Sequence, residues 1–123
     1  MERRVDPRIK MRRRLGLIQS DGAVVKLWTY DLSRGGMQVF SEYAAERGQE
    51  FGVFFSIFDP VGKEYERIDA RVKVAHVLYD GAQHCYRIGL QFTNFRGNCR
   101  EMFERCLEFR MRLQMMRQQA RLY

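Results

Sequence analysis

The chain lacks the features that mark membrane-spanning, disulfide-bonded and zinc-binding proteins. No apolar run approaches the roughly 20 residues of a transmembrane helix, and no apolar signal region follows the N-terminal arginines. The three cysteines, Cys85, Cys99 and Cys106, form no C-x-x-C pair, so we expect reduced thiols, buried in the case of Cys99 and Cys106. These absences predict a soluble cytoplasmic protein with no membrane span, no metal ion and no cofactor.

Proline and glycine are too scarce for a disordered or collagen-like chain. The 123 residues include two prolines and 10 glycines, whereas 46% are hydrophobic and 13% aromatic. This composition can bury a core of large side chains, and the length fits one domain of roughly 100–150 residues. We therefore expect a single globular domain.

The sequence also contains no recognisable catalytic machinery. It has neither a G-x-x-x-x-G-K-[ST] nor a G-x-G-x-x-G phosphate loop, and no serine or cysteine stands in a nucleophile elbow. His76 and His84 lie eight residues apart in expected strands, and Glu64, Glu66 and Asp69 fit exposed strand positions. We do not expect an enzyme.

The net charge of +7 is concentrated at the two ends of the chain. Residues 1–14 carry seven basic and two acidic side chains, and residues 96–123 carry seven arginines and three glutamates. Residues 15–95 carry eight basic and ten acidic side chains. Arginine dominates the excess, and its planar guanidinium both binds phosphate and stacks on bases, which indicates an anionic, nucleotide-like partner. Charge alone fits equally well with basic ends that are simply solvated.

Alternating and β-branched segments predict an antiparallel barrel or sandwich, because six strands follow one another with short polar turns and no intervening helix. The six expected strands cover residues 12–18, 23–30, 37–40, 50–58, 65–79 and 83–92. Trp28, Phe54 and Phe55 have apolar neighbours and are expected in the core. Residues 1–11 show no useful periodicity, so we expect a flexible arm without core contacts.

A helix is expected over residues 95–122, where no proline occurs. Cys99, Phe103 and Leu107 widen its apolar face over the first turns, so the first half is expected to cover the barrel. The second half fits either a solvated tail or a pairing helix, through which the chain could form a homodimer. Heptad-like steps of three and four residues support pairing, and they join Met102, Cys106, Phe109, Leu113, Met116 and Ala120.

Two short segments could bind a nucleotide. The turn at residues 30–36 places Asp31 and Ser33 at a strand exit, before two glycines that can adopt positive φ. A carboxylate there suits the N–H donors of guanine, although the same side chains can simply bond their own backbone. In the expected arm, Arg4 and Arg8 follow the pattern R-x-x-x-R and could wrap a phosphodiester ring. That spacing recurs elsewhere in this arginine-rich chain and is weak evidence alone.

Taken together, the two segments resemble the motifs of the PilZ domain family. The family's R-x-x-x-R motif matches residues 4–8, RVDPR, and its [DN]-x-S-x-x-G motif matches residues 31–36, DLSRGG. The last expected strand, YRIGLQF at residues 86–92, is also similar to family members. The resemblance spans about residues 2–110, and the order, separation and strand context of the motifs agree.

The resemblance implies a six-stranded antiparallel PilZ-type β-barrel with a long C-terminal α-helix. The chain would then divide into a ligand-binding arm (1–11), a barrel (12–95) and a helix (96–123). It also implies a receptor for cyclic di-GMP that changes the conformation of its arm on binding and signals to a protein partner that the sequence does not identify.

The resemblance further assigns roles to individual residues. Arg4 and Arg8 would contact the phosphates and guanine of cyclic di-GMP. A guanine would be held against the barrel by Asp31, Ser33 and Gly36. Arg3 occupies a position that accompanies binding of two stacked ligand molecules in the family. His76, in the fifth expected strand, could present its ring to a guanine face or be an ordinary strand residue.

Two alternatives stay open at this stage. The first is a PilZ-like adaptor that binds no nucleotide and acts through its C-terminal helix, although the intact motif residues argue against it. The second is a small basic barrel that binds nucleic acid. We do not expect nucleic acid binding, because residues 23–58 lack the interleaved basic and aromatic side chains of a stacking platform, and Trp28, Phe54 and Phe55 are expected in the core.

Overall fold

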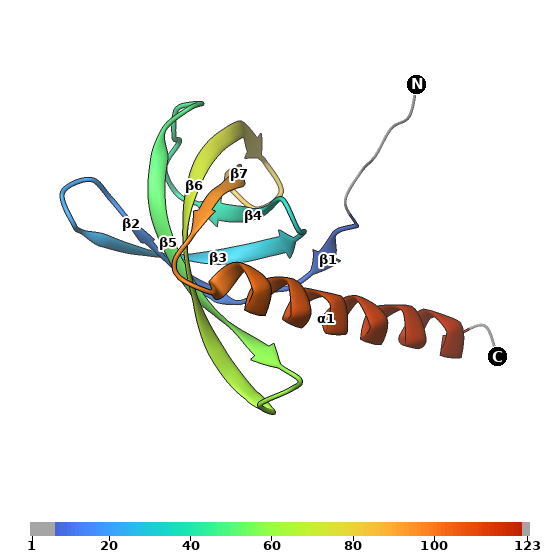
Figure 1. Cartoon of the computed structure of the whole chain (residues 1–123). Helices are drawn as coiled ribbons and strands as arrows, with labels where there is room; N and C mark the ends of the chain where they lie inside the picture. Colours follow the sequence, from blue (N-terminus) through green and yellow to red (C-terminus); the bar gives the residue numbers. More distant parts are fainter. Residues whose placement is uncertain (1–6, 122–123) are drawn as a thin grey trace, which may run out of the picture.

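The computed structural model describes residues 7–121 as a curved antiparallel sheet that closes into a barrel, followed by one long helix (Figure 1). These segments form strands because their apolar and polar side chains alternate, which places the apolar ones on the inner face of the sheet. The elements are β1 (Ile9–Lys10), β2 (Arg14–Ile18), β3 (Val24–Leu32), β4 (Gly36–Ser41), β5 (Glu50–Asp59), β6 (Glu64–Asp80), β7 (Cys85–Phe95) and α1 (Cys99–Arg121).

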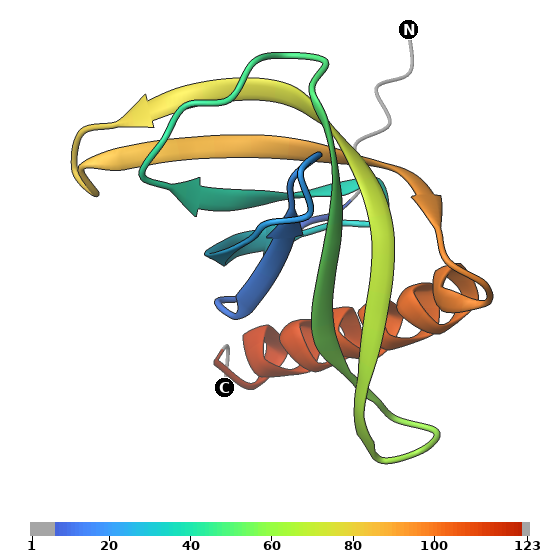
Figure 2. The same ribbon diagram turned by 90° about the vertical axis from the view of Figure 1, so that its left-hand side faces the viewer.

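The barrel is formed by six strands that pair in the order β3-β2-β5-β6-β7-β4, and β4 pairs with β3 to close it. Every pairing is antiparallel, and the strands curve strongly around the enclosed core (Figure 2). The prediction of a six-stranded antiparallel barrel with a C-terminal helix is confirmed. Within residues 7–121, no helix is long and apolar enough to cross a membrane.

The core contains the inward-facing residues of the strands and is covered on one side by α1. In β5 the alternation is plain, because Val53, Phe55 and Ile57 are buried between outward-facing neighbours. Phe103 of α1 is fully buried, and its ring lies 5.1 Å from that of Phe92, centroid to centroid. The first half of the helix therefore covers the barrel, as predicted.

The structure differs from the expected arm at residues 9–11. Ile9 and Met11 are buried, and β1 pairs with the end of β3 through Ile9↔Leu32 and Lys10↔Asp31. The expectation that the whole segment 1–11 lacks core contacts is therefore wrong for these residues. Two apolar side chains separated by one lysine form a strand too short to show as a period in the sequence.

The expectation that Trp28 and Phe54 belong to the core is also wrong. Trp28 faces outward between buried Leu27 and Thr29 and is 37% exposed. Phe54 lies on the outer face, where its ring covers the backbone of Gly16. Phe55 is buried, as expected. Each strand has an inward and an outward face, and a run of apolar residues does not tell which residues take which face.

The barrel uses part of the heptad-like seam of α1. Cys106 is buried, and the ring of Phe109 packs 5.9 Å from that of Phe58 in β5. The C-terminal half of α1 extends past the barrel, with Met115 and Met116 largely exposed (Figure 1). The seam left for pairing with another helix is therefore shorter than the sequence suggested.

Candidate functional site

The turn between β3 and β4 is held together by its own hydrogen bonds and by β7. The backbone N–H of Ser33 donates to the carbonyl of Gly36 at 2.8 Å, and the Ser33 hydroxyl lies 3.3 Å from the same oxygen. The N–H of Phe92 donates to the carbonyl of Gly35 at 2.9 Å. Ser33 is buried, so its hydroxyl is part of a fixed turn.

Gly36 is required here by crowding. It pairs with Gln91 of β7, and a Cβ atom at this position would lie 2.1 Å from the carbonyl oxygen of Leu90. Its φ is not positive, contrary to the reason that the sequence suggested for a glycine in this turn. The close approach of the turn to β7 therefore excludes any side chain at residue 36.

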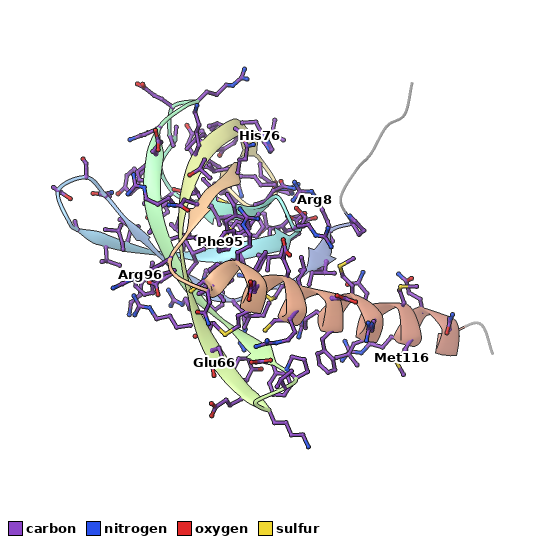
Figure 3. All side chains as sticks on the ribbon, in the orientation of Figure 1. Arg8, Glu66, His76, Phe95, Arg96 and Met116 are labelled. Carbon is purple, nitrogen blue, oxygen red and sulfur yellow. The ribbon has the colours of Figure 1, made fainter. Side chains whose placement is uncertain are left out.

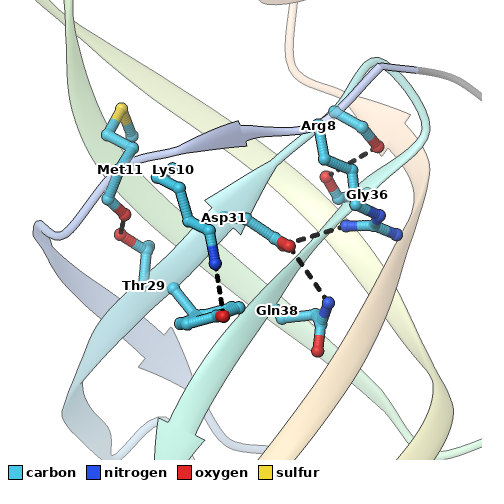
Figure 4. Close-up of polar contacts among 9 residues, drawn as sticks. Arg8, Lys10, Met11, Thr29, Asp31, Gly36 and Gln38 are labelled. Carbon is cyan, nitrogen blue, oxygen red and sulfur yellow. Dashed lines mark hydrogen bonds and ion pairs between the residues drawn. The ribbon is translucent and has the colours of Figure 1, made fainter.

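Asp31 lies on the outer face of β3, next to a bulge, and its carboxylate has two donors (Figure 4). Arg8 Nη1 donates to Oδ1 at 2.9 Å, and Gln38 Nε2 donates to Oδ2 at 3.1 Å. The Asp31 side chain is only 7% exposed, whereas that of Arg8 is 41% exposed. The two motifs, 23 residues apart in sequence, therefore meet at this carboxylate.

β1 brings the arm to Asp31. Lys10 pairs directly with Asp31, which places Arg8 just beyond the end of β3. The carbonyl of Met11 accepts a hydrogen bond from the buried Thr29 hydroxyl and fixes the chain between β1 and β2 (Figure 4). Arg3 and Arg4 lie outside the described residues, so only Arg8 of the three arm arginines can be placed.

His76 lies in the same row of outward-facing residues as Asp31, but at the other end. The register joins Asp31 to Gln38, Gln38 to Gly89, and Gly89 to His76 across four strands. Three strand spacings amount to about 14 Å. The His76 ring covers Gly89, where a Cβ atom would lie 2.0 Å from it. Figure 3 shows His76 and Arg8 well apart on this side of the barrel.

Gln38 and Gly89 are members of this row that sequence reasoning did not select. Gln38 holds the second oxygen of Asp31, and Gly89 leaves room for the His76 ring. Gln38 is polar within an otherwise mostly apolar strand, which was a usable signal. Gly89 gave no such signal, because its importance depends on the pairing of β7 with β6.

Aromatic and cationic side chains continue from Asp31 along β3. Lys10 donates a hydrogen bond to the Tyr30 hydroxyl, and the guanidinium of Arg87 lies 4.3 Å from the centroid of the Tyr30 ring. Arg87 is fixed by an ion pair with Asp80 at 2.8 Å. The site thus offers a carboxylate acceptor at Asp31, a partly exposed guanidinium donor at Arg8, and a flat cationic surface where Arg87 lies over the Tyr30 ring. Together these groups suit an anionic heterocyclic ligand.

The family model of the PilZ domain matches residues 2–109, and the chain belongs to the PilZ domain family. The match contains both motifs, the whole barrel and the first half of α1. No curated protein sequence matches the chain.

Solved structures show the same fold at low sequence identity. The inhibitor of motility MotI/DgrA of Bacillus subtilis has a TM-score of 0.70 and 14% identity, covering 91% of this chain and 53% of its own. YcgR of Escherichia coli in complex with c-di-GMP has a TM-score of 0.63 and 16% identity, covering 99% and 51%. The MrkH–c-di-GMP complex of K. pneumonia has a TM-score of 0.64 and 17% identity, covering 98% and 56%. The chain therefore spans about half the length of these proteins.

Proposed function

We propose that this chain is a receptor for cyclic di-GMP, acting by binding rather than by catalysis. The observation that carries the proposal is the contact of Arg8 with Asp31, because it joins the two family motifs at one carboxylate beside a turn fixed by Ser33 and Gly36. Family membership and two structural relatives that contain c-di-GMP support the choice of ligand.

Because the Asp31 side chain is only 7% exposed with Arg8 in contact, a ligand that reaches this carboxylate would exchange with one of its partners. The N1–H and N2 amino group of guanine would donate to the Asp31 carboxylate, but its two oxygens already accept from Arg8 and Gln38. A guanine that takes the oxygen held by Arg8 releases the guanidinium, which then donates to a phosphate or to the O6 and N7 atoms of a base. The ligand thereby changes the position of the arm.

The remaining site residues complete the proposal. Arg4 supplies a second guanidinium to the phosphates, and Arg3 leads us to propose two stacked ligand molecules per chain. His76, at the far end of the row from Asp31, presents its ring to a guanine. The rearranged arm changes the charge and shape beside β1, and a protein partner reads that change.

Isothermal titration with cyclic di-GMP tests the proposal. We expect saturable binding by the natural chain, a loss of at least tenfold in affinity for Arg8→Ala, and no heat with GMP at the same concentrations. Arg96→Ala is the matched control, because Arg96 is an exposed arginine away from Arg8 (Figure 3) and should bind like the natural chain. Absence of heat from a folded natural chain would overturn the proposal.

The exposed end of α1 supports a second proposal, contact with another chain through this helix. Met115 is 59% exposed and Met116 63% exposed, on a segment that extends past the barrel. A second copy of the helix could cover them, which would form a homodimer. Light scattering coupled to size exclusion would show a dimer for the natural chain and a monomer for Met115→Lys with Met116→Lys; a natural chain that is monomeric at high concentration contradicts it.

A further inference from the structure

The outer face of β2, β3 and β5 carries a second cationic and aromatic region, which we call the Trp28 surface. Its members are arginines and a lysine placed beside two outward-facing rings. The register brings them together, because Arg14 pairs with Trp28, and Gly16 lies between Lys26 and Phe54. The surface consists of Arg12, Arg14, Lys26, Trp28, Phe54 and Arg67. We propose that the Trp28 surface is a docking site for an acidic segment of a protein partner.

The rings position the cations. The guanidinium carbons of Arg14 and Arg12 lie 4.6 Å and 5.1 Å from the centroid of the Trp28 ring. The guanidinium of Arg67 lies 4.2 Å from the centroid of Phe54. Cation–π contacts of this length hold a guanidinium near a ring and leave its N–H groups able to bind an anion, as at Arg12 and Arg14. The Nε and Nη2 groups of Arg67 already donate to Asp69. The rings therefore hold the arginines in place before an anion binds. These side chains have less rotamer freedom to lose on binding than isolated arginines.

The charge of the surface is unbalanced. A groove of about 650 Å³ runs along it, and its lining contains Arg12, Arg14, Lys26 and Arg67 with no acidic side chain. Among residues 7–121, no carboxylate forms an ion pair with Arg12, Arg14 or Lys26. Arg67 does pair with Asp69, at 3.0 Å. Glu42 lines an adjoining groove with these three cations but forms no ion pair with them within residues 7–121. Three cations crowded together in this way favour an anionic occupant, and Trp28 offers an apolar anchor beside them.

The contacts at Trp28 favour carboxylates over nucleic acid. A nucleic-acid platform stacks bases on exposed aromatic faces. Here two guanidiniums lie against the single tryptophan, and the Phe54 ring rests on the backbone of Gly16 beneath Arg67. What the surface presents outward is guanidinium forks, which donate pairs of hydrogen bonds to Asp and Glu carboxylates.

The position of the surface gives it a use in signalling. Arg12 follows β1 directly, four residues after Arg8, so one short segment joins the Asp31 site to the Trp28 surface. Trp28 lies three residues before Asp31 on β3, about 10 Å along the strand. A partner bound at the Trp28 surface would therefore also contact the segment between Arg8 and Arg12, whose position changes when the arm rearranges. Docking itself does not depend on the cyclic di-GMP proposal.

The test uses the fluorescence of Trp28, the one tryptophan of the chain. The probe is a short synthetic peptide of glutamate and leucine, compared with a glutamine and leucine peptide and with oligothymidylate. We expect a saturable emission change with the acidic peptide only, weakening as salt is raised. Arg14→Glu with Lys26→Glu should weaken it at least tenfold, whereas Arg117→Glu, at an exposed position on α1, should leave it unchanged.

Three results would overturn the proposal. They are no saturable change with the acidic peptide, tighter binding of oligothymidylate than of the peptide, or an equal loss in Arg117→Glu. Titration of Arg14→Glu with cyclic di-GMP separates the two sites, because this variant should keep the affinity of the natural chain. If it loses that affinity while Arg117→Glu keeps it, the Trp28 surface belongs to the ligand site and the docking proposal fails.

Discussion

At the scale of single residues, the proposed function gives Asp31 the main part in ligand recognition. Its side chain is nearly buried, yet both oxygens accept hydrogen bonds, one from the partly exposed Arg8 and one from Gln38 of β4. A carboxylate in this position accepts hydrogen bonds without donating any, so a ligand must bring N–H groups. Arg8 donates to one of the two oxygens, so under the proposed function it competes with cyclic di-GMP for that oxygen.

Asp31→Asn separates the charge of this side chain from its shape. We expect cyclic di-GMP affinity to fall at least tenfold, about 1.4 kcal/mol, because an amide offers a weaker acceptor and adds a donor facing the N–H groups of guanine. The ion pair with Arg8 is partly exposed, so the free energy of unfolding should fall by no more than about 1 kcal/mol. Titration calorimetry and urea unfolding measure the two quantities. Equal affinity for both chains would remove guanine recognition from Asp31.

Gly36→Ala tests the packing of the turn on β7. The added Cβ would lie 2.1 Å from the Leu90 carbonyl oxygen, which is backbone and cannot move without distorting β7. We expect the free energy of unfolding to fall by about 1–3 kcal/mol, and cyclic di-GMP affinity to fall with it. Gly81→Ala is the matched control, since no atom lies within 4 Å of its added Cβ and the change should stay within about 0.5 kcal/mol. Similar losses in both variants would contradict the account of Gly36.

At the scale of elements, one ion pair attaches α1 to the end of β5. Arg105 Nη2 donates to Asp59 Oδ2 at 2.7 Å, and Arg105 Nε donates to Oδ1 at 3.1 Å. The N–H of Val61 donates to the same Oδ1 at 3.0 Å, so Asp59 also shapes the β5–β6 turn. The hydrogen bonds from Arg105 hold the pKa of the Asp59 carboxyl below its usual 3.8, although burial acts in the opposite direction.

This pKa predicts how stability depends on acid. A carboxylate whose pKa is lower in the folded than in the unfolded chain stabilises the fold above the unfolded value, and that stabilisation is lost as the pH falls through the folded pKa. Between about pH 5 and pH 2, the natural chain should therefore lose more stability than Asp59→Asn. Thermal unfolding across this range measures the difference, and parallel curves for the two chains would contradict it.

The elements themselves were largely predictable from the sequence, but their faces were not. Alternation in segments such as residues 50–58 predicted strands within a residue or two of the observed ends. β1 was missed because its pairing with β3 depends on distant residues. Trp28 was assigned to the wrong face because both faces of β3 carry large apolar side chains. Periodicity identifies a strand, whereas burial depends on the partner strands that the fold supplies.

The same limit applies to the candidate site. The residues of the β3–β4 turn and the arm could be selected because their motifs are local in sequence. Gln38 was polar within a mostly apolar strand, but nothing local linked it to Asp31, and Gly89 gave no signal at all, because both join Asp31 to His76 only through the register of four strands. The part of a binding site that comes from neighbouring strands becomes visible only when those strands are paired.

At the scale of the whole molecule, the charge is distributed unevenly between the N-terminal arm and the barrel, so the two parts suit different partners. The first 14 residues carry seven basic and two acidic side chains, and Arg8 and Lys10 among them lie at the Asp31 site, whereas the barrel segment 15–95 carries more acidic than basic side chains. An anionic ligand is therefore attracted towards the arm rather than to the barrel as a whole. On this account the ligand changes the position of the arm, and a protein partner binds the Trp28 surface, whose residue Arg12 directly follows the arm in the sequence.

The location of bound cyclic di-GMP tests the central claim most directly, and amide NMR of the isotopically labelled chain measures it. The account predicts that titration shifts the amides of Arg8, Lys10, Asp31, Ser33 and Gly36 first, leaving those of the last turns of α1 unchanged. The shifts should saturate together, because one site produces them. Saturable shifts confined to α1, or to the Trp28 surface without the β3–β4 turn, would contradict the account.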